Sequence, residues 1–148
     1  TVLGMINTMS DSFDPKRCFA YELVGGWTVL AGRTDADNEY VSLKLARAND
    51  WWFHIRGMPG SHVILLENET GEPDRDTLKA AAAIAAYHSK ARKGRLVPVS
   101  CTRAQNVSKP RGAKQGTVNI KKEIVLKVRP ATQDSLNAIQ ARQSNEET

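Results

Sequence analysis

Short apolar stretches, separated by glycine, proline and polar residues, divide most of the chain, and this pattern is typical of β-strands. Gly25-Gly26 separates the first two stretches and suits the tight turn of a β-hairpin. Pro59-Gly60 separates another two and fits a type II turn, in which proline is followed by a glycine with positive φ. The predicted strands are residues 18–24, 28–32, 51–55, 63–66, 96–101 and 124–128.

One long helix is predicted from about Arg75 to Lys93. Asp74 or Asp76 can cap its start, and Gly94 can end it. Its apolar face is rich in alanine, which lets a helix backbone pack close to a sheet. The sequence therefore predicts an α+β fold, with a mostly antiparallel sheet of hairpins covered by one main helix.

The remaining segments have weaker patterns. Residues 35–37 are expected to turn the chain, and residues 40–45 fit either a helix or a strand. Residues 1–16 form a predicted flexible lead-in, and residues 131–148 a polar tail that fits a frayed helix, a linker or a disordered end. The folded domain is thus expected to occupy residues 17–130, which is an ordinary domain length.

Three aromatic residues, two histidines and an arginine surround the predicted Pro59-Gly60 turn. Alternation along residues 51–55 separates an Ile-Phe face, suited to a core, from a face that carries Trp52, His54 and Arg56. The second face is the better platform for an unpaired nucleotide, because aromatic rings stack on any base. Alternation alone leaves open which face is buried.

His54 and His62 share a face of this hairpin only if the connecting turn holds an odd number of residues, and a two-residue turn at Pro59-Gly60 would separate them. No further ligands have a spacing typical of zinc, so neither a metal site nor a cofactor is expected. Ser61 lacks a G-x-S-x-G elbow and is interpreted as a turn residue whose hydroxyl group could hold an anion.

Charge is distributed unevenly along the chain, whose net charge is +5. Residues 90–129 carry 12 basic side chains and a single acidic one, Glu123, whereas residues 1–89 carry 8 basic and 12 acidic side chains. A basic block of this density indicates a polyanionic ligand, and a solvated basic face is the alternative.

Two segments concentrate these cations. The loop that contains Lys109, Arg111 and Lys114 also holds two glycines, which favours close approach to phosphate oxygens, and its spacing is not that of a Walker A motif. The segment 89–93 would lie in the last turn of the predicted helix, where cations are favoured with or without a ligand. If the helix end and the loop meet, they form one basic surface.

Composition adds three limits. With 148 residues and 41% hydrophobic side chains, the chain can build a core, and it has no apolar run of the ~18 residues that a membrane span needs. The N-terminus shows no secretory signal, so a cytoplasmic protein is expected. Cys18 and Cys101 are too few for a disulfide framework and are expected to be reduced and packed.

Six motifs between about residues 20 and 130 resemble, in order and spacing, the NFACT-R domain of ribosome-quality-control proteins. They are Val29-Leu30-Ala31-Gly32-Arg33, Asp37-Asn38-Glu39-Tyr40, Trp52-Phe53-His54, Pro59-Gly60-Ser61-His62-Val63, Ala81-Ala82-Ala83 with Ser89-Lys90-Ala91-Arg92, and Val107-Ser108-Lys109-Pro110-Arg111-Gly112-Ala113-Lys114-Gln115-Gly116. The resemblance implies a module that binds RNA, with tRNA or large-subunit ribosomal RNA as ligand and the ribosome as a possible partner. The chain has no room for the other parts of those proteins, so a stand-alone domain is expected.

The primary hypothesis is accordingly a non-enzymatic RNA-binding module, in which phosphate contacts position the ligand and unpaired bases supply selectivity. Phosphate contacts do not separate RNA from DNA, so DNA remains open. One alternative is a protein-interaction module that docks through the aromatic hairpin, and a second is a nucleic-acid-processing enzyme that uses His54, Ser61 and His62. The predicted RNA-binding residues are Arg33, Asn38, Trp52, His54, Arg56, Ser61, His62, Lys90, Arg92, Lys93, Arg103, Lys109, Arg111 and Lys114.

Overall fold

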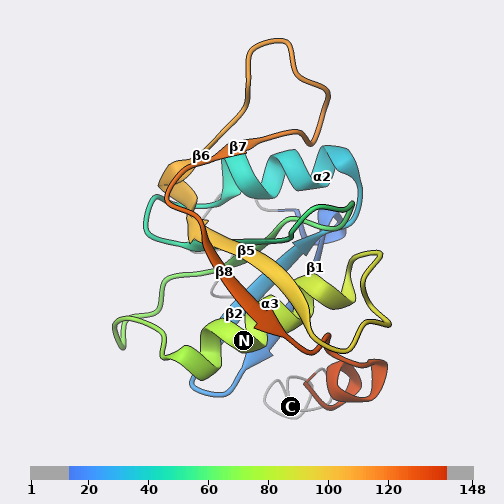
Figure 1. Cartoon of the computed structure of the whole chain (residues 1–148). Coiled ribbons are helices and arrows are strands. Elements are labelled where there is room, and N and C mark those ends of the chain that lie inside the picture. The colour runs from blue at the N-terminus through green and yellow to red at the C-terminus, as the bar shows by residue number, and fades with distance from the viewer. Residues whose placement is uncertain (1–13, 140–148) are drawn as a thin grey trace.

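The computed structural model describes residues 14–139, and the predicted lead-in falls almost wholly outside this range. Six antiparallel strands form one sheet in the order β1-β2-β4-β3-β5-β8 (Figure 1). These strands are β1 (Cys18–Leu23), β2 (Trp27–Gly32), β3 (Trp51–Ile55), β4 (Val63–Leu65), β5 (Val97–Arg103) and β8 (Ile124–Val128). A separate short ribbon pairs β6 (Val107–Ser108) with β7 (Asn119–Ile120). The α+β fold with a mostly antiparallel sheet is confirmed.

Helices cover both faces of the sheet. On one face, α3 (Arg75–Tyr87) packs its small alanine-rich side against the sheet. On the other, α2 (Asp35–Tyr40) continues into η2 (Val41–Leu45), and both pack with β6 over a second core. The prediction named one covering helix. Of this helical pair, only η2 and the last residue of α2 lie in residues 40–45, which fitted either a helix or a strand. Thr34 starts α2 by accepting a hydrogen bond from the Asp37 backbone, so the predicted turn at residues 35–37 is wrong.

Helix α3 begins where the sequence places it but ends earlier. The Asp74 side chain caps it by accepting a hydrogen bond from Thr77 N–H. The helix ends at Tyr87, because the chain then turns to hydrogen-bond with the β3–β4 connection: Ser61 N–H donates to His88 O at 2.8 Å, and Lys90 N–H donates to Pro59 O at 3.2 Å. The predicted end near Lys93 and Gly94 is wrong for this tertiary reason.

The first hairpin, β1–β2, turns at Gly25 and Gly26 as predicted, and both have positive φ. Two shorter helical turns complete the order of elements: η1 (Pro15–Arg17) precedes β1, and η3 (Ala104–Asn106) follows β5. Residues 133–139 are helical, and Leu136 is buried in the core beneath α3, so packing continues beyond the predicted boundary at residue 130. Within residues 14–139, no helix has the length and apolar character needed to span a membrane.

Candidate nucleic-acid interface

The connection between β3 and β4 spans residues 56–62 and determines how the two histidines lie. Its length is odd, and the Phe53–Val63 pair places His54 opposite His62 on the same face of the sheet. Their rings meet edge to face, with centroids 5.3 Å apart. The positive φ in this connection lies at Gly57, at 80°, and not at Gly60. The predicted two-residue turn at Pro59-Gly60, which would have separated the histidines, is therefore wrong.

His62 lies in a buried hydrogen-bond network. Trp52 Nε1–H donates to Ser42 Oγ at 2.8 Å, and Ser42 Oγ lies 2.7 Å from His62 Nδ1. The backbone N–H of His62 donates to the Asn38 side-chain oxygen at 3.0 Å. Burial, followed by the nearby His54 ring, lowers the pKa of His62 to about 4, and burial also lowers the pKa of His54. Both imidazoles are therefore neutral at pH 7.

The face that carries Trp52 is not the open platform that the alternation suggested. Phe53 and Ile55 are fully buried in the core under α3, as favoured from the sequence, but Trp52 is also only 3% exposed because α2 and η2 cover it. Its indole ring therefore holds the second core together and offers no free face to a nucleotide. Asn38, also buried, orients the His62 backbone.

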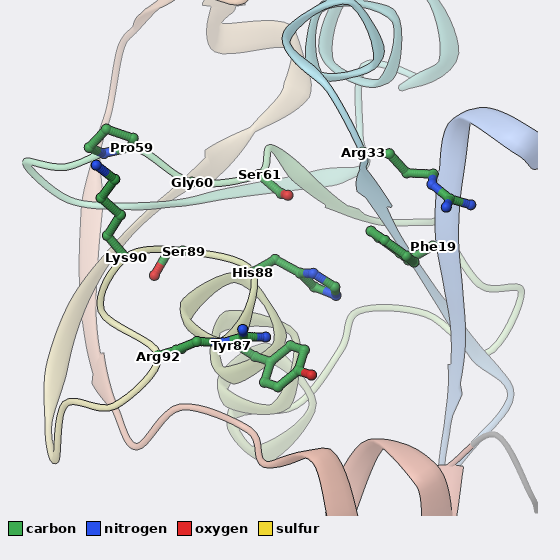
Figure 2. Close-up of a pocket in the computed structure, with 10 residues that line it drawn as sticks. All are labelled: Phe19, Arg33, Pro59, Gly60, Ser61, Tyr87, His88, Ser89, Lys90 and Arg92. Carbon is green, nitrogen blue, oxygen red and sulfur yellow. The ribbon is translucent and has the colours of Figure 1, made fainter.

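One surface hollow of about 380 Å³, here called the Arg33 pocket, opens where β2 ends, beside the segment that follows α3. The β3–β4 connection and the segment after α3 form its walls, and Figure 2 shows Arg33 and Phe19 on one side and Lys90 on the other. Its lining residues are Phe19, Arg33, Pro59, Gly60, Ser61, Tyr87, His88, Ser89, Lys90 and Arg92.

Aromatic rings and guanidinium groups stack along this pocket. The Arg33 guanidinium lies 4.6 Å from the centre of the Phe19 ring, and Phe19 stacks on His88 with centroids 4.7 Å apart. Tyr87 meets His88 edge to face, and the Arg92 guanidinium lies 4.4 Å from the centre of the Tyr87 ring. His88 Nε2 lies 2.7 Å from the Tyr21 hydroxyl, and burial lowers the His88 pKa to about 4. The positive charge of the pocket thus comes from Arg33, Lys90 and Arg92.

A second hollow, also of about 380 Å³ and here called the histidine pocket, contains His54 and His62. Arg56 lies at this pocket, but its Nε is 3.7 Å from a carboxylate oxygen of Glu123. Glu123 in turn accepts a hydrogen bond from Ser100 Oγ. The lining residues are Trp52, His54, Ile55, Arg56, Gly57, His62, Ser100, Gly116, Thr117, Val118, Ile120 and Glu123.

Ser61 and the two histidines lie in different pockets. Ser61 lines the Arg33 pocket, and its hydroxyl donates to Gly32 O at 2.7 Å, whereas His54 and His62 line the histidine pocket. A serine nucleophile needs a base within hydrogen-bond reach. The geometry therefore gives no support to a catalytic pair of Ser61 with His54 or His62. Within the described range, no cluster of three or more His, Cys, Asp or Glu residues is arranged to hold a metal.

The predicted cations differ in whether a carboxylate already pairs with them. Arg103 Nη2 lies 2.6 Å from Glu72 Oε2 and its guanidinium stacks on Trp51, and Lys109 Nζ lies 2.6 Å from Glu39 Oε1. Arg103 also lies at the end of β5 that is farther from the Arg33 pocket. Among the residues described, no carboxylate lies within ion-pair distance of Arg33, Lys90 or Arg92. Of the predicted RNA-binding cations, these three therefore both line one pocket and are free to bind an anion.

The loop with Arg111 and Lys114 is separate from that pocket. Figure 1 shows it projecting past α2, on the side away from α3, so the loop does not meet the segment that follows α3. Gly116 holds the base of the loop against α2, since a Cβ there would lie 3.3 Å from the Asp35 backbone oxygen and its φ is +85°. Lys93 is exposed beyond the pocket.

Sequence reasoning missed three residues of this interface. Phe19 and His88 line the Arg33 pocket and Ser42 holds His62, yet none lies in a pattern that points to a site. His88 directly precedes the predicted basic segment, which is the only signal that the sequence offered. Cys18 and Cys101 are buried and unbridged as predicted, and burial raises the pKa of each thiol to about 12.

Gly60 lies directly against Ser89, where the two walls of the Arg33 pocket meet. A Cβ at residue 60 would lie 2.7 Å from Ser89 Cβ and 2.9 Å from Ile55 Cγ2. We expect Gly60→Ala to lower the free energy of unfolding by about 1–3 kcal/mol through overpacking. Chemical denaturation would measure this loss, and Gly57→Ala, where a Cβ meets nothing within 4 Å but φ is +80°, separates backbone strain from the clash. Equal losses in the two variants would contradict the close-packing explanation.

Comparison with known proteins gives consistent similarities. A family model described as "NFACT protein RNA binding domain" matches residues 17–122. Among curated proteins, the chain is 41% identical over 110 residues to "Rqc2 homolog RqcH" of Bacillus subtilis, covering 74% of this chain and 19% of that protein. It is 34% identical over 125 residues to the protein of the same name from Streptococcus suis, covering 84% of this chain and 22% of that protein.

A solved structure is also similar. It is the C-terminal part of the fibronectin/fibrinogen-binding protein from Streptococcus suis, which matches with a TM-score of 0.78 and 32% identity over 86% of this chain and 50% of that one. This chain therefore spans about a fifth of the length of the curated relatives it matches and half of the solved fragment.

Proposed function

Since the chain belongs to the NFACT protein RNA-binding domain family, we propose that it binds tRNA or large-subunit ribosomal RNA in ribosome-associated quality control in the cytoplasm. The observation that carries this proposal is the Arg33 pocket, which contains three cationic side chains. None of the three has a carboxylate partner among the residues that the structure describes. Phosphate oxygens are the natural ligands of such a site, since guanidinium groups match them bidentately.

Two separate contact regions support an extended ligand. The Arg33 pocket lies on one side of the β3–β4 connection, and the loop with Lys109, Arg111 and Lys114 projects beyond α2 (Figure 1). A folded RNA can reach both, whereas a short anion reaches one. The two regions would position the RNA through its backbone, and selectivity would come from unpaired bases.

The role proposed is binding without catalysis. Ser61 donates its hydroxyl hydrogen to the Gly32 carbonyl, in a different pocket from His54 and His62. His54 and His62 serve instead to hold the sheet face and the β3–β4 connection in place, through contact with each other and with the Ser42 network.

The test is fluorescence anisotropy with labelled tRNA, duplex DNA and single-stranded RNA, each over a range of salt concentrations. We expect tRNA to bind more tightly than duplex DNA, with a strong dependence on salt. The triple variant Lys109→Ala/Arg111→Ala/Lys114→Ala should lower the slope of log K against log salt by about two to three, since each lost duplex phosphate contact removes ~0.9.

A matched control removes three exposed cations that lie outside both pockets and the loop, with the changes Lys16→Ala, Arg75→Ala and Lys127→Ala. This triple variant should leave the slope nearly unchanged. Equal slopes in the two triple variants would contradict the loop's role. A failure of all three nucleic acids to bind at moderate salt would overturn RNA binding and favour a module that docks on a protein partner.

A further inference from the structure

We propose that the Arg33 pocket is a subsite for one unpaired nucleotide of an RNA chain, with its phosphate between Arg33 and Arg92 and its base against the stacked side chains. This inference rests on the proposed RNA binding and adds a preference for single-stranded over paired segments. The sequence alone suggested that a nucleotide binds at the Trp52 face, whereas the proposed subsite lies on the opposite side of the β3–β4 connection.

The charge of the pocket selects an anion. Its lining contains three cationic side chains and no acidic one, whereas the histidine pocket pairs its one cation, Arg56, with Glu123. His88 is neutral at pH 7 because burial lowers its pKa. An incoming phosphate therefore meets uncompensated positive charge at the Arg33 pocket and an existing ion pair at the histidine pocket.

The two arginines are held in place before any ligand arrives. Arg33 lies over Phe19 and Arg92 lies over Tyr87, and the two rings are joined through His88. A guanidinium stacked on a ring keeps its N–H groups in the plane, pointing outward, where they can bind phosphate oxygens. Its outer face remains a flat surface on which a base can stack. Figure 2 shows the Arg33 and Arg92 groups on two sides of His88.

The backbone makes this arrangement rigid. Ser61 N–H donates to His88 O, Lys90 N–H donates to Pro59 O, and Gly60 pairs with Ser89 as an isolated β-bridge. Ser61 and Ser89 stand on the two facing walls, and the hydroxyl group of each donates to a backbone carbonyl, of Gly32 and Ala86 respectively. Because the walls are already formed, less conformational entropy is lost when a ligand binds.

Contact with the base distinguishes an unpaired nucleotide from a duplex. A hollow of about 380 Å³ lies within the range of small-ligand sites, which is the scale of a single nucleotide. Bases inside a duplex are covered by their neighbours and reach such a hollow only after leaving the stack. Phosphates alone would fit either form, so the base contact is what creates the preference for single strands.

The experiment compares a blunt RNA duplex with the same duplex carrying a short adenosine overhang, using the full chain and fluorescence anisotropy. Wild type should bind the overhang RNA more tightly. Arg33→Gln/Arg92→Gln should weaken overhang binding by about tenfold or more and abolish the preference, since stacking and phosphate contacts are lost together. The exposed Arg75→Gln, at the far end of α3, is the control and should preserve both affinity and preference.

A second readout does not depend on the double variant folding well. A photoreactive 4-thiouridine placed in the overhang should crosslink wild type within residues 87–92 or at Phe19, as peptide mapping by mass spectrometry would show. Crosslinks only in the loop 109–118, or equal loss of duplex and overhang binding in the double variant, would overturn the nucleotide subsite while leaving RNA binding intact. Absence of binding to every RNA in wild type would overturn the proposed function itself.

Discussion

Acidification from about pH 6.5 to about pH 4 is expected to lower the free energy of unfolding by ~3 kcal/mol for each of His62 and His88. Burial is the main cause of the low pKa, about 4, of both residues in the folded domain, against an ordinary value of 6.5. Below pH 6.5 the unfolded chain binds more protons than the folded one, so stability is fully present above that pH and is lost as the pH falls. His54 shifts in the same direction.

Three carboxyl groups also have shifted pKa values and act mainly at the acidic end of this window. Burial raises the pKa of Asp50, so this carboxyl group opposes the loss as the pH falls. Glu39 and Asp74 have lowered pKa values, because Lys109 and the Thr77 backbone stabilise their charged forms. Their contributions are lost as the pH falls below their ordinary pKa values of 4.5 and 3.8, so they add to the loss at the acidic end of this window. Denaturant unfolding, followed over a pH series by tryptophan fluorescence, measures the effect. His62→Gln and His88→Gln should each reduce the dependence of the free energy of unfolding on pH. A wild-type free energy of unfolding that stays constant from pH 6.5 to pH 4.5 would contradict the prediction.

Ser42→Ala is expected to destabilise the domain by about 1–3 kcal/mol for each buried group that it leaves unpaired. Two groups are affected, because Ser42 Oγ accepts the hydrogen bond from Trp52 Nε1–H and also contacts His62 Nδ1. All three residues are at most 5% exposed, so water does not replace the lost hydroxyl group at no cost. Chemical denaturation of Ser42→Ala against wild type measures the loss.

A double-mutant cycle separates the free energy contributed by the Trp52–Ser42 hydrogen bond from the cost of the space that the removed hydroxyl group leaves. Trp52→Phe removes the indole donor, so Ser42→Ala should cost less in the Trp52→Phe background than in wild type. Ser42→Thr retains a hydroxyl group and serves as the matched variant. If Ser42→Ala costs the same in both backgrounds, the Trp52–Ser42 hydrogen bond does not contribute to stability.

Local sequence signals predicted the hairpins and the start of the main helix well, because these depend on neighbouring residues. Gly25 and Gly26 supply positive φ at the β1–β2 turn, and Asp74 caps α3 through a hydrogen bond three residues away. The end of α3 could not be predicted in this way. It is set by hydrogen bonds from the β3–β4 connection, which lies 27 or more residues earlier in the chain.

For the candidate site too, the sequence predicted some residues correctly, and tertiary contacts decided the outcome for the others. Arg33, Ser61, Lys90 and Arg92 were identified from sequence, and the structure brings all four into one pocket. Trp52 and Arg103 were also predicted, but one is buried under α2 and the other is paired with Glu72. A residue type shows what chemistry is possible, whereas burial and ion pairing show whether that chemistry is still available.

The sequence by itself determined the α+β class, the strand pairs around Gly25-Gly26 and residues 51–66, the surplus of cations after residue 90 and the family resemblance. Only the tertiary structure decided that His54 faces His62, that Ser61 lies on the other side of the connection, and that Phe19 and His88 complete the Arg33 pocket. The physical reason is that turn type and strand period are local properties of the backbone. Pocket composition and ion pairing depend instead on contacts between segments far apart in the chain.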